Sequence, residues 1–242
     1  MSNATGVINH APPCRHRRVH VICEGQTEEM FVNLMLQPHF DAHKIEVHPK
    51  LLGATGHVPS AQRHGGNVSY KRVMTDIRLL LDNDPTAYVT TFIDFYGIYA
   101  DFPGVRQAKR LRTAWERHDA VVKAMFAQLA DDLGGEQTSR VVPYIQMHEF
   151  EGLLFSSPRD MASGILQPHL WKKFDKILFP FDTPEDINDS IETAPSKRIQ
   201  SIFRGYQKVL HGSIIAKRIG IERIRQACPL FDEWLDRIEQ LP

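Results

Sequence analysis

Four short apolar runs, mostly separated by segments with helical periodicity, constrain the fold of this chain most strongly. They are rich in β-branched and aromatic residues and predict strands at Val19–Cys23, Ile45–Leu52, Ala87–Asp94 and Val141–Met147. Between them, helical patterns occur at Thr27–Leu36, Tyr70–Leu81 and Arg106–Leu133. This alternation is typical of parallel strands joined by crossover helices. The sequence therefore predicts an α/β fold with a parallel sheet of about four strands flanked by helices.

The pattern changes after Leu154. Short helical stretches separated by prolines lead to two longer predicted helices, at Lys197–Ile219 and Pro229–Leu241. We expect an α/β core at 15–156 and a mostly helical carboxyl-terminal part at 157–242 packed on it. Gly53–Gly66 contains four glycines and two histidines, His57 and His64, and predicts a loop at the rim of the sheet.

The total charge does not favour any class of partner, because Lys+Arg and Asp+Glu both number 29. The distribution is less even. Residues 195–225 contain one acid, Glu222, and eight basic residues: Lys197, Arg198, Arg204, Lys208, Lys217, Arg218, Arg223 and Arg225. Such a surplus suits a phosphate backbone, although the solvated faces of helices have the same composition.

Cysteine use and hydropathy indicate the compartment. Cys14, Cys23 and Cys228 are odd in number and share no CxxC spacing, which favours a reducing environment. No stretch approaches the roughly 18 apolar residues of a membrane span, and the first residues have no signal-peptide pattern. We expect a cytoplasmic protein with no membrane segment.

Acidic residues follow three of the four predicted strands. Glu24 follows the first strand, Asp94 closes the third, and Glu149 with Glu151 follows the fourth. Glu28 lies one helical turn beyond Glu24, in a helix for which Thr27 is a candidate cap. The carboxyl ends of parallel strands meet at one edge of a sheet, where ligands bind in open α/β folds. Three to five carboxylates at such an edge suit one or two hard divalent cations such as Mg²⁺.

Taken singly, each of these acids fits a helix cap or a turn better than a metal site. Taken together they favour a shared site, because Asp94 and Glu149 follow runs too apolar to bury an acid without a counter-charge. His148-Glu149 is not part of an HExxH zinc motif, since residue 152 is glycine. GxSxG, GxxxxGK[ST] and GxGxxG motifs do not occur, so serine hydrolase, P-loop and dinucleotide-binding functions lack support.

Six short motifs give the chain a family resemblance that extends over most of its length, from Val19 to Leu235. In sequence order they are EGQTEE, DxYG, DFPG, EFEGLLF, ETAPSKRI and YxKxxHG, which begin at Glu24, Asp94, Asp101, Glu149, Glu192 and Tyr206. In these motifs the chain resembles a Toprim-like bacterial family of unknown function (DUF4276). It is also similar to the Toprim domain of overcoming-lysogenization-defect nucleases.

The resemblance implies a Toprim core, Mg²⁺ or Mn²⁺ at its acidic edge, and cleavage of phosphodiester bonds. It matches Glu24 to the first-motif glutamate, Glu28 to the second acid and Asp94 to the first acid of the Toprim Asp-x-Asp. Tyr96 stands where the second aspartate is expected, so a ligand is missing unless Asp101, Glu149 or Glu151 replaces it. Relatives of this kind often occur beside an ATPase in anti-phage defence loci, which implies such a partner.

The leading hypothesis is a metal-dependent nuclease that acts on DNA or RNA. Glu24, Asp94 and Glu149 would hold one ion that activates a water, and Glu28 with Glu151 a second that stabilises the leaving oxygen. Four residues are candidates to act on the phosphoryl oxygens or on a proton: Lys197, Arg198, Lys208 and His211. A non-catalytic regulatory or nucleic-acid-binding subunit of an ATPase complex is the alternative, favoured by Tyr96. A small-molecule phosphohydrolase, which needs the metal but no basic surface, is the third hypothesis.

Overall fold

The computed structural model describes residues 16–53, 68–188 and 190–242. Within them, five parallel strands form one sheet, in the order β2-β1-β3 with β4 and β5 both beside β3. The strands are β1 (Arg17–Cys23), β2 (Ile45–Leu51), β3 (Tyr88–Asp94), β4 (Val141–Val142) and β5 (Ile145–Gln146). The predicted α/β class and parallel sheet are confirmed.

The predicted fourth strand, Val141–Met147, is two short strands separated by Pro143 and Tyr144. Proline has no N–H to donate to a neighbouring strand, so the pairing is interrupted there. The side chain of Thr91 replaces it: its Oγ1 donates to the Tyr144 carbonyl at 2.7 Å and accepts the Tyr144 N–H at 3.0 Å. The predicted loop at 53–66 lies outside the described residues except for Gly53, which has a φ of 77° in the turn after β2.

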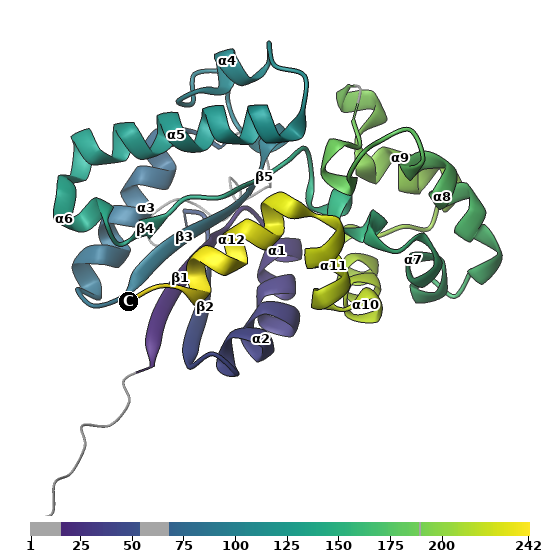
Figure 1. The fold of residues 1–242 in the computed structure, drawn as a ribbon, viewed down its shortest axis with the longest axis horizontal. Helices are drawn as coiled ribbons and strands as arrows, with labels where there is room; N and C mark the ends of the chain where they lie inside the picture. Colours follow the sequence, from purple (N-terminus) through teal and green to yellow (C-terminus); the bar gives the residue numbers. More distant parts are fainter. Residues whose placement is uncertain (1–15, 54–67, 189) are drawn as a thin grey trace, which may run out of the picture.

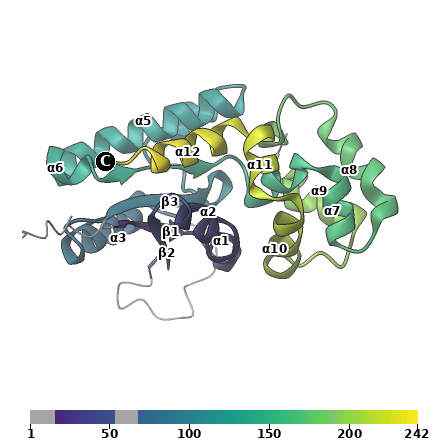
Figure 2. The ribbon, with the colours of Figure 1, turned by 60° about the horizontal axis from the view of Figure 1, so that its bottom comes forward.

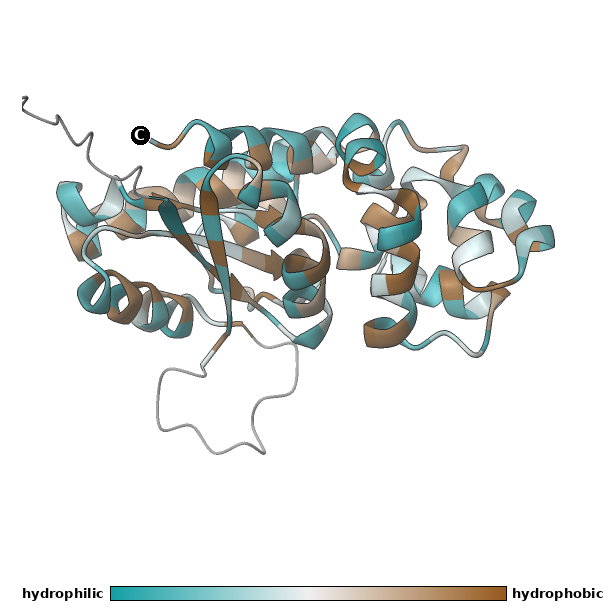
Figure 3. Cartoon of the chain, turned by 90° about the horizontal axis from the view of Figure 1, so that it is seen from below, coloured by the Kyte–Doolittle hydropathy of each residue, from teal (hydrophilic) through white to brown (hydrophobic). Residues whose placement is uncertain are grey.

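Helices cover both faces of the sheet (Figures 1 and 2). On one face lie α1 (Gln26–Phe31), the π-helical turn Val32–Leu36, α2 (Gln37–Asp41) and α12 (Pro229–Glu239), and Phe31 of α1 contacts Phe231 of α12. On the other lies α3 (Tyr70–Asn83), which is hydrogen-bonded to α5 (Ala114–Leu133) beside it. In Figure 3 hydrophobic and hydrophilic residues alternate along the helices, as expected for amphipathic helices packed on a sheet.

Two predicted helices are interrupted. The pattern over Arg106–Leu133 corresponds to α4 (Val105–Ala108) and α5, which begins with a capping box between Thr113 and Glu116. Lys197–Ile219 corresponds to α9 (Pro195–Ile202) and α10 (Lys208–Ile219). Thr27 is not a cap, because α1 begins one residue earlier than predicted and its N-cap is Gly25.

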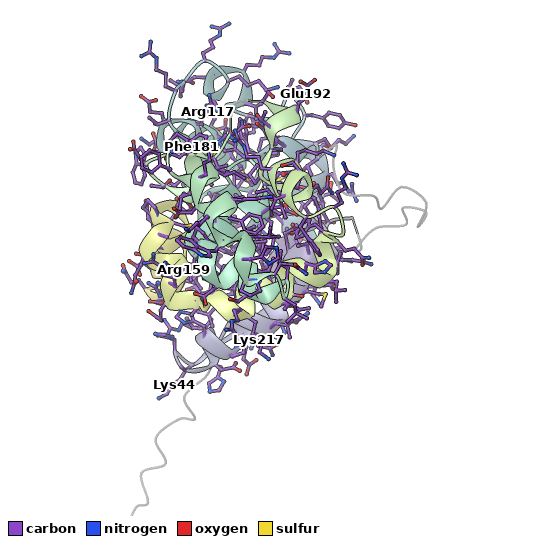
Figure 4. The ribbon with its side chains drawn as sticks, turned by 90° about the vertical axis from the view of Figure 1, so that its right-hand side faces the viewer. Lys44, Arg117, Arg159, Phe181, Glu192 and Lys217 are labelled. Atoms are coloured by element: carbon purple, nitrogen blue, oxygen red, sulfur yellow. The ribbon has the colours of Figure 1, made fainter. Side chains whose placement is uncertain are left out.

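One further short helix, α6 (Gly135–Thr138), belongs to the core. The helices α7 (Pro158–Gly164), α8 (Trp171–Leu178) and α11 (Ile221–Ala227), with α9 and α10, build the carboxyl-terminal part beside the sheet edge (Figure 1). Figure 4 views this end, with Arg159 of α7 and Lys217 of α10 labelled. No helix in the described part of the chain is long and apolar enough to cross a membrane.

The last helix returns to the core. In α12, the indole of Trp234 stacks on Tyr144 with ring centroids 4.4 Å apart, and its Nε1 donates to Thr90 Oγ1 at 2.8 Å. Both Tyr144 and Trp234 are almost fully buried. The last helix of the chain therefore packs into the core of the sheet, while the domain boundary at 156 stays a prediction.

Candidate active site

The sheet brings five acidic residues toward its carboxyl-terminal edge, and we call them the acidic centre: Glu24, Glu28, Asp94, Glu149 and Glu151. They come from the end of β1, from α1, from the end of β3, and from the turn and 3₁₀-helix (Phe150–Ser156) that follow β5. Because β1 and β3 are adjacent and parallel, Glu24 and Asp94 follow neighbouring strand ends, as the sequence predicted.

Backbone N–H groups fix three of the carboxylates. The Glu24 carboxylate accepts the N–H of Asp94 at 3.0 Å, and Glu28 accepts the N–H of Gly25 at 2.8 Å. Asp94 Oδ1 accepts the N–H of Phe150 at 2.8 Å, which ties the end of β3 to the segment after β5. Gly97 lies against Glu24: a Cβ there would be 2.3 Å from a carboxylate oxygen.

The other two carboxylates share the ammonium group of Lys208, the first residue of α10. Its Nζ lies 3.3 Å from Glu149 Oε1 and 3.1 Å from Glu151 Oε2. Glu149 also accepts the N–H of Ser196, at the start of α9, at 2.9 Å. Glu151 accepts the Tyr206 hydroxyl at 3.3 Å. The helical part therefore completes the site that the sheet begins.

Burial and like charge raise the pKa values of Glu28, Asp94 and Glu151. Burial, with the charge of Glu24 adding to it, raises the pKa of Glu28 to about 7. Burial also raises the pKa of Glu151 to about 7, although Lys208 opposes the shift. The pKa of Asp94 is raised well above its ordinary value, first by burial and then by Glu28 and Glu24. For Lys208, burial alone would lower the pKa, but the surrounding carboxylates, Glu151 first, raise it.

The acidic centre fits a hard divalent cation by its chemistry and charge. Its donors are carboxylate oxygens, which Mg²⁺ and Mn²⁺ prefer, and the Lys208 ammonium group pairs with two of the five, Glu149 and Glu151. Its oxygens are nonetheless spread out. Among the described residues, no three of these carboxylates offer oxygens that all lie within 4.8 Å of one another.

The group that does meet this distance is His39, His43 and Glu239, from α2, the turn after it and the end of α12. Arg225 occupies this position already, since its guanidinium donates to Glu239 at 2.5 Å and lies 3.3 Å from His39 Nε2. Arg225 also pairs with Asp232 and Asp236. This network joins α11 and α12 to α2 and accounts for these side chains without a metal ion.

The structure places the other predicted site residues differently. Lys197 is exposed on α9, where it has no ion pair with the described residues within 4.0 Å. His211 Nδ1 accepts the N–H of Gln207 at 2.9 Å, and the imidazole thus caps the beginning of α10 beside Tyr206. Arg198 donates to the carbonyl of Thr193 at 2.7 Å. Among these four candidates, Lys208 is the one for which the described residues show a contact with the acidic centre.

Tyr96, which stands where the second aspartate is expected, packs against neighbouring rings and supplies no carboxylate. Tyr96 packs on His148 with ring centroids 5.4 Å apart, and its N–H donates to the His148 carbonyl. Asp101 is exposed in the turn that follows. Glu149 and Glu151 are the additional acids that the fold brings to the centre.

The basic segment 195–225 does not form one surface. Lys208 faces the acidic centre, Arg225 lies in its ion-pair network, and Arg223 donates to the Ser156 carbonyl at 3.1 Å. Lys217 and Arg218 lie at the far end of α10, where Arg218 is 4.0 Å from Asp160. The predicted surplus of positive charge is therefore divided among separate structural roles.

Two contributors were not predicted as site residues, Tyr206 and Gly97. Both belong to the short motifs noted in the sequence, YxKxxHG and DxYG, so the signal was available. Their contacts with Glu151 and Glu24 became evident only with the packing of α10 and of the turn after β3.

A family model described as "Domain of unknown function (DUF4276)" matches residues 23–239, which include every member of the acidic centre. No curated protein and no solved structure matches the chain.

Proposed function

The chain belongs to the DUF4276 family, whose function is unknown, and we propose that it is a Mg²⁺- or Mn²⁺-dependent nuclease with a Toprim-like core. One observation carries the proposal: five carboxylates from separate segments gather at the carboxyl edge of a parallel sheet, and Lys208 pairs with two of them, Glu149 and Glu151. Burial, and then the charge of neighbouring carboxylates, raises the pKa values of Glu28, Asp94 and Glu151, and a divalent cation would favour their ionised forms.

Residues of the acidic centre would hold the metal as the sequence suggests. Glu24, Asp94 and Glu149 are the proposed ligands of one ion, and Glu28 and Glu151 of a second. A bound divalent cation acidifies a water and neutralises charge on phosphoryl oxygens. The N–H groups of Asp94, Phe150 and Ser196 fix the carboxylates, so that little reorganisation is needed when substrate binds. Lys208, already at the centre, is the residue placed to neutralise a phosphate oxygen.

The substrate and setting follow from the family resemblance. We propose DNA or RNA as the substrate, an ATPase as a partner protein, and a role in anti-phage defence in the cytoplasm. The dispersal of the basic segment means that a polymer would be held by smaller groups of cations, such as Lys217 with Arg218, and not by one continuous patch.

A regulatory subunit that binds without cutting is the second candidate. Two observations favour it: Tyr96 replaces an expected ligand, and Lys208 already pairs with Glu149 and Glu151. In this function the lysine would be the permanent counter-ion of the acidic centre.

Cleavage assays on the full chain separate the two candidates. We expect single- or double-stranded DNA or RNA to be cut with Mg²⁺ or Mn²⁺ and to stay intact with EDTA. Glu24→Gln and Asp94→Asn should each lower the rate by roughly 100-fold or more, because each removes a negative charge that holds the metal ion. Glu222→Gln, an exposed acid on α11, is the matched control and should keep full activity.

Calorimetry with Mn²⁺ on the same proteins completes the test. Metal binding that Asp94→Asn weakens, with no cleavage of any nucleic acid, would favour the regulatory subunit. Cleavage that is equal in wild type and Glu24→Gln would overturn the nuclease proposal.

A further inference from the structure

A cavity of about 390 Å³ opens between α5 and α12. The two helices lie side by side there in both ribbon views (Figures 1 and 2). The volume lies within the range of small-molecule binding pockets, about 300–1,000 Å³. No residue of the acidic centre lines this cavity.

Aromatic side chains form much of its wall. Trp115 and Phe126 of α5 line the cavity together with Val122, and the two aromatic residues are 53% and 40% exposed. Flat apolar walls of this kind bury planar rings well, because stacked or edge-on ring contacts add to the area removed from water.

A buried polar group also lines the cavity and lacks a partner. His118 Nε2 is shielded from solvent and makes no hydrogen bond with the described residues. The ring lies 5.5 Å from that of Tyr144, on the side of the core. Burial, and then the charge of Arg237, lowers the pKa of His118 to about 4, so the imidazole is neutral at pH 7. Its Nε2 is free to form one hydrogen bond with a bound molecule.

The charges around the cavity are not equally available. Asp119 and Lys123 pair with each other at 2.8 Å. Arg237 and Glu233, one turn apart on α12, form no ion pair within 4.0 Å in the part of the chain that the structure describes. Of these two, Arg237 is the one whose charge acts on His118. An anionic group beside His118 would therefore meet the guanidinium, whose forked N–H donors match a carboxylate.

We propose that this cavity binds a small planar aromatic molecule that carries one carboxylate. The ring packs on the wall of α5 beside Trp115, one turn from His118, and the carboxylate binds Arg237 and His118 Nε2. The site does not depend on the acidic centre or on nuclease activity, so the two proposals fail independently.

The test uses 2-naphthoate as the probe and 2-naphthamide, its uncharged counterpart, as the control ligand. Binding to the full chain is measured by NMR, from the indole N–H signals of the three tryptophans. The signal that is missing in Trp115→Phe belongs to Trp115. We expect naphthoate to shift this signal with a dissociation constant of about 1 mM or lower, which suits its size. Naphthamide should bind about tenfold more weakly, since it lacks the charge that pairs with Arg237.

Arg237→Gln decides whether the charge is read as proposed. The substitution should weaken naphthoate binding by about tenfold and leave the affinity for naphthamide unchanged. The variant should then bind the two probes equally and lose the preference for the anion. Arg218→Gln is the matched control, since Arg218 is a largely exposed arginine on α10 and should keep the preference. The proposal is overturned if the Trp115 signal does not respond, if wild type binds both probes equally, or if Arg237→Gln retains the preference.

Discussion

Gly97 is the residue on which the position of Glu24 depends. A methyl group at this residue would lie 2.3 to 2.6 Å from three atoms of the Glu24 carboxyl group. These atoms are the end of a flexible side chain, so in Gly97→Ala the carboxylate should move away while the backbone stays in place. A displacement of about 1 Å can reduce an enzyme's rate by about 100-fold.

We therefore expect Gly97→Ala to lose metal-dependent cleavage by roughly 10- to 100-fold and to change the free energy of unfolding by less than about 1 kcal/mol. Gly135→Ala is the control, because a Cβ at Gly135 meets nothing within 4 Å. Cleavage rates and urea unfolding curves of Gly97→Ala and Gly135→Ala test this expectation. Full activity in Gly97→Ala would mean that Glu24 does not act from its observed position.

At the residue scale, the sequence predicted the acids better than their partners. Glu24 and Asp94 could be assigned to one edge because each ends an apolar run, and strand ends of a parallel sheet lie together. Ser196 and Tyr206 could not, because their contacts depend on how α9 and α10 pack beside the sheet. Periodicity reveals which face of a helix is buried, but not the element that it is buried against.

At the scale of elements, Glu185 shows how a buried acid can hold a helix start. Its two carboxylate oxygens accept the N–H groups of Leu230 and Phe231 at 2.9 Å, in the first turn of α12. Glu185 is 1% exposed, and burial raises its pKa to about 8 in spite of these two hydrogen bonds, which lower it. The helix N-terminus thus lowers the pKa of this carboxyl group, and the apolar environment raises it.

This pKa predicts how stability depends on pH. The folded protein keeps the Glu185 proton up to about pH 8, whereas the unfolded chain releases it near the ordinary value of 4.5. The contribution of Glu185 to stability is therefore complete below about pH 4.5 and is lost as the pH rises toward 8. Between pH 5 and 8 the free energy of unfolding of wild type should fall by up to about 4 kcal/mol more than that of Glu185→Gln.

Urea unfolding at pH 5, 6.5 and 8 measures how the free energy of unfolding of wild type and of Glu185→Gln changes with pH. Only the difference between wild type and Glu185→Gln is informative, since Glu28 and Glu151 titrate in both proteins. Parallel pH profiles would show that Glu185 is ionised in the fold at neutral pH, with its two N–H donors outweighing burial.

The type of each element, helix or strand, was predicted more accurately than the residues at which it begins and ends. β1, β2 and β3 agree with the apolar runs to within two residues at each end. The fourth run splits at Pro143, and the longest helical pattern splits before Thr113, which caps α5. Both breaks have a local cause, a missing N–H or a capping side chain, that a hydrophobic pattern alone does not reveal.

At the scale of the whole molecule, the acidic centre joins two regions of the chain. The sheet supplies Glu24 and Asp94, while Lys208 and the N–H of Ser196 come from the helical part. At pH 8 Glu28 and Glu151 are mostly ionised, and the native state carries the repulsion between Glu28 and Glu24 and that between Glu151 and Glu149. A divalent cation bound there should relieve this repulsion in the folded state alone.

Binding to the native state stabilises it by RT ln(1 + [L]/Kd), about 2.7 kcal/mol when the metal is at 100 times its dissociation constant. We expect saturating MgCl₂ at pH 8 to raise the free energy of unfolding of wild type by about 2 to 3 kcal/mol over KCl of equal ionic strength. Asp94→Asn keeps an acceptor for the Phe150 N–H but loses the charge, and its gain should be below about 1 kcal/mol. Glu222→Gln should respond as wild type does. Equal stability in the two salts, or equal gains in wild type and Asp94→Asn, would mean that the acidic centre does not bind the cation and that Lys208 alone balances its charge.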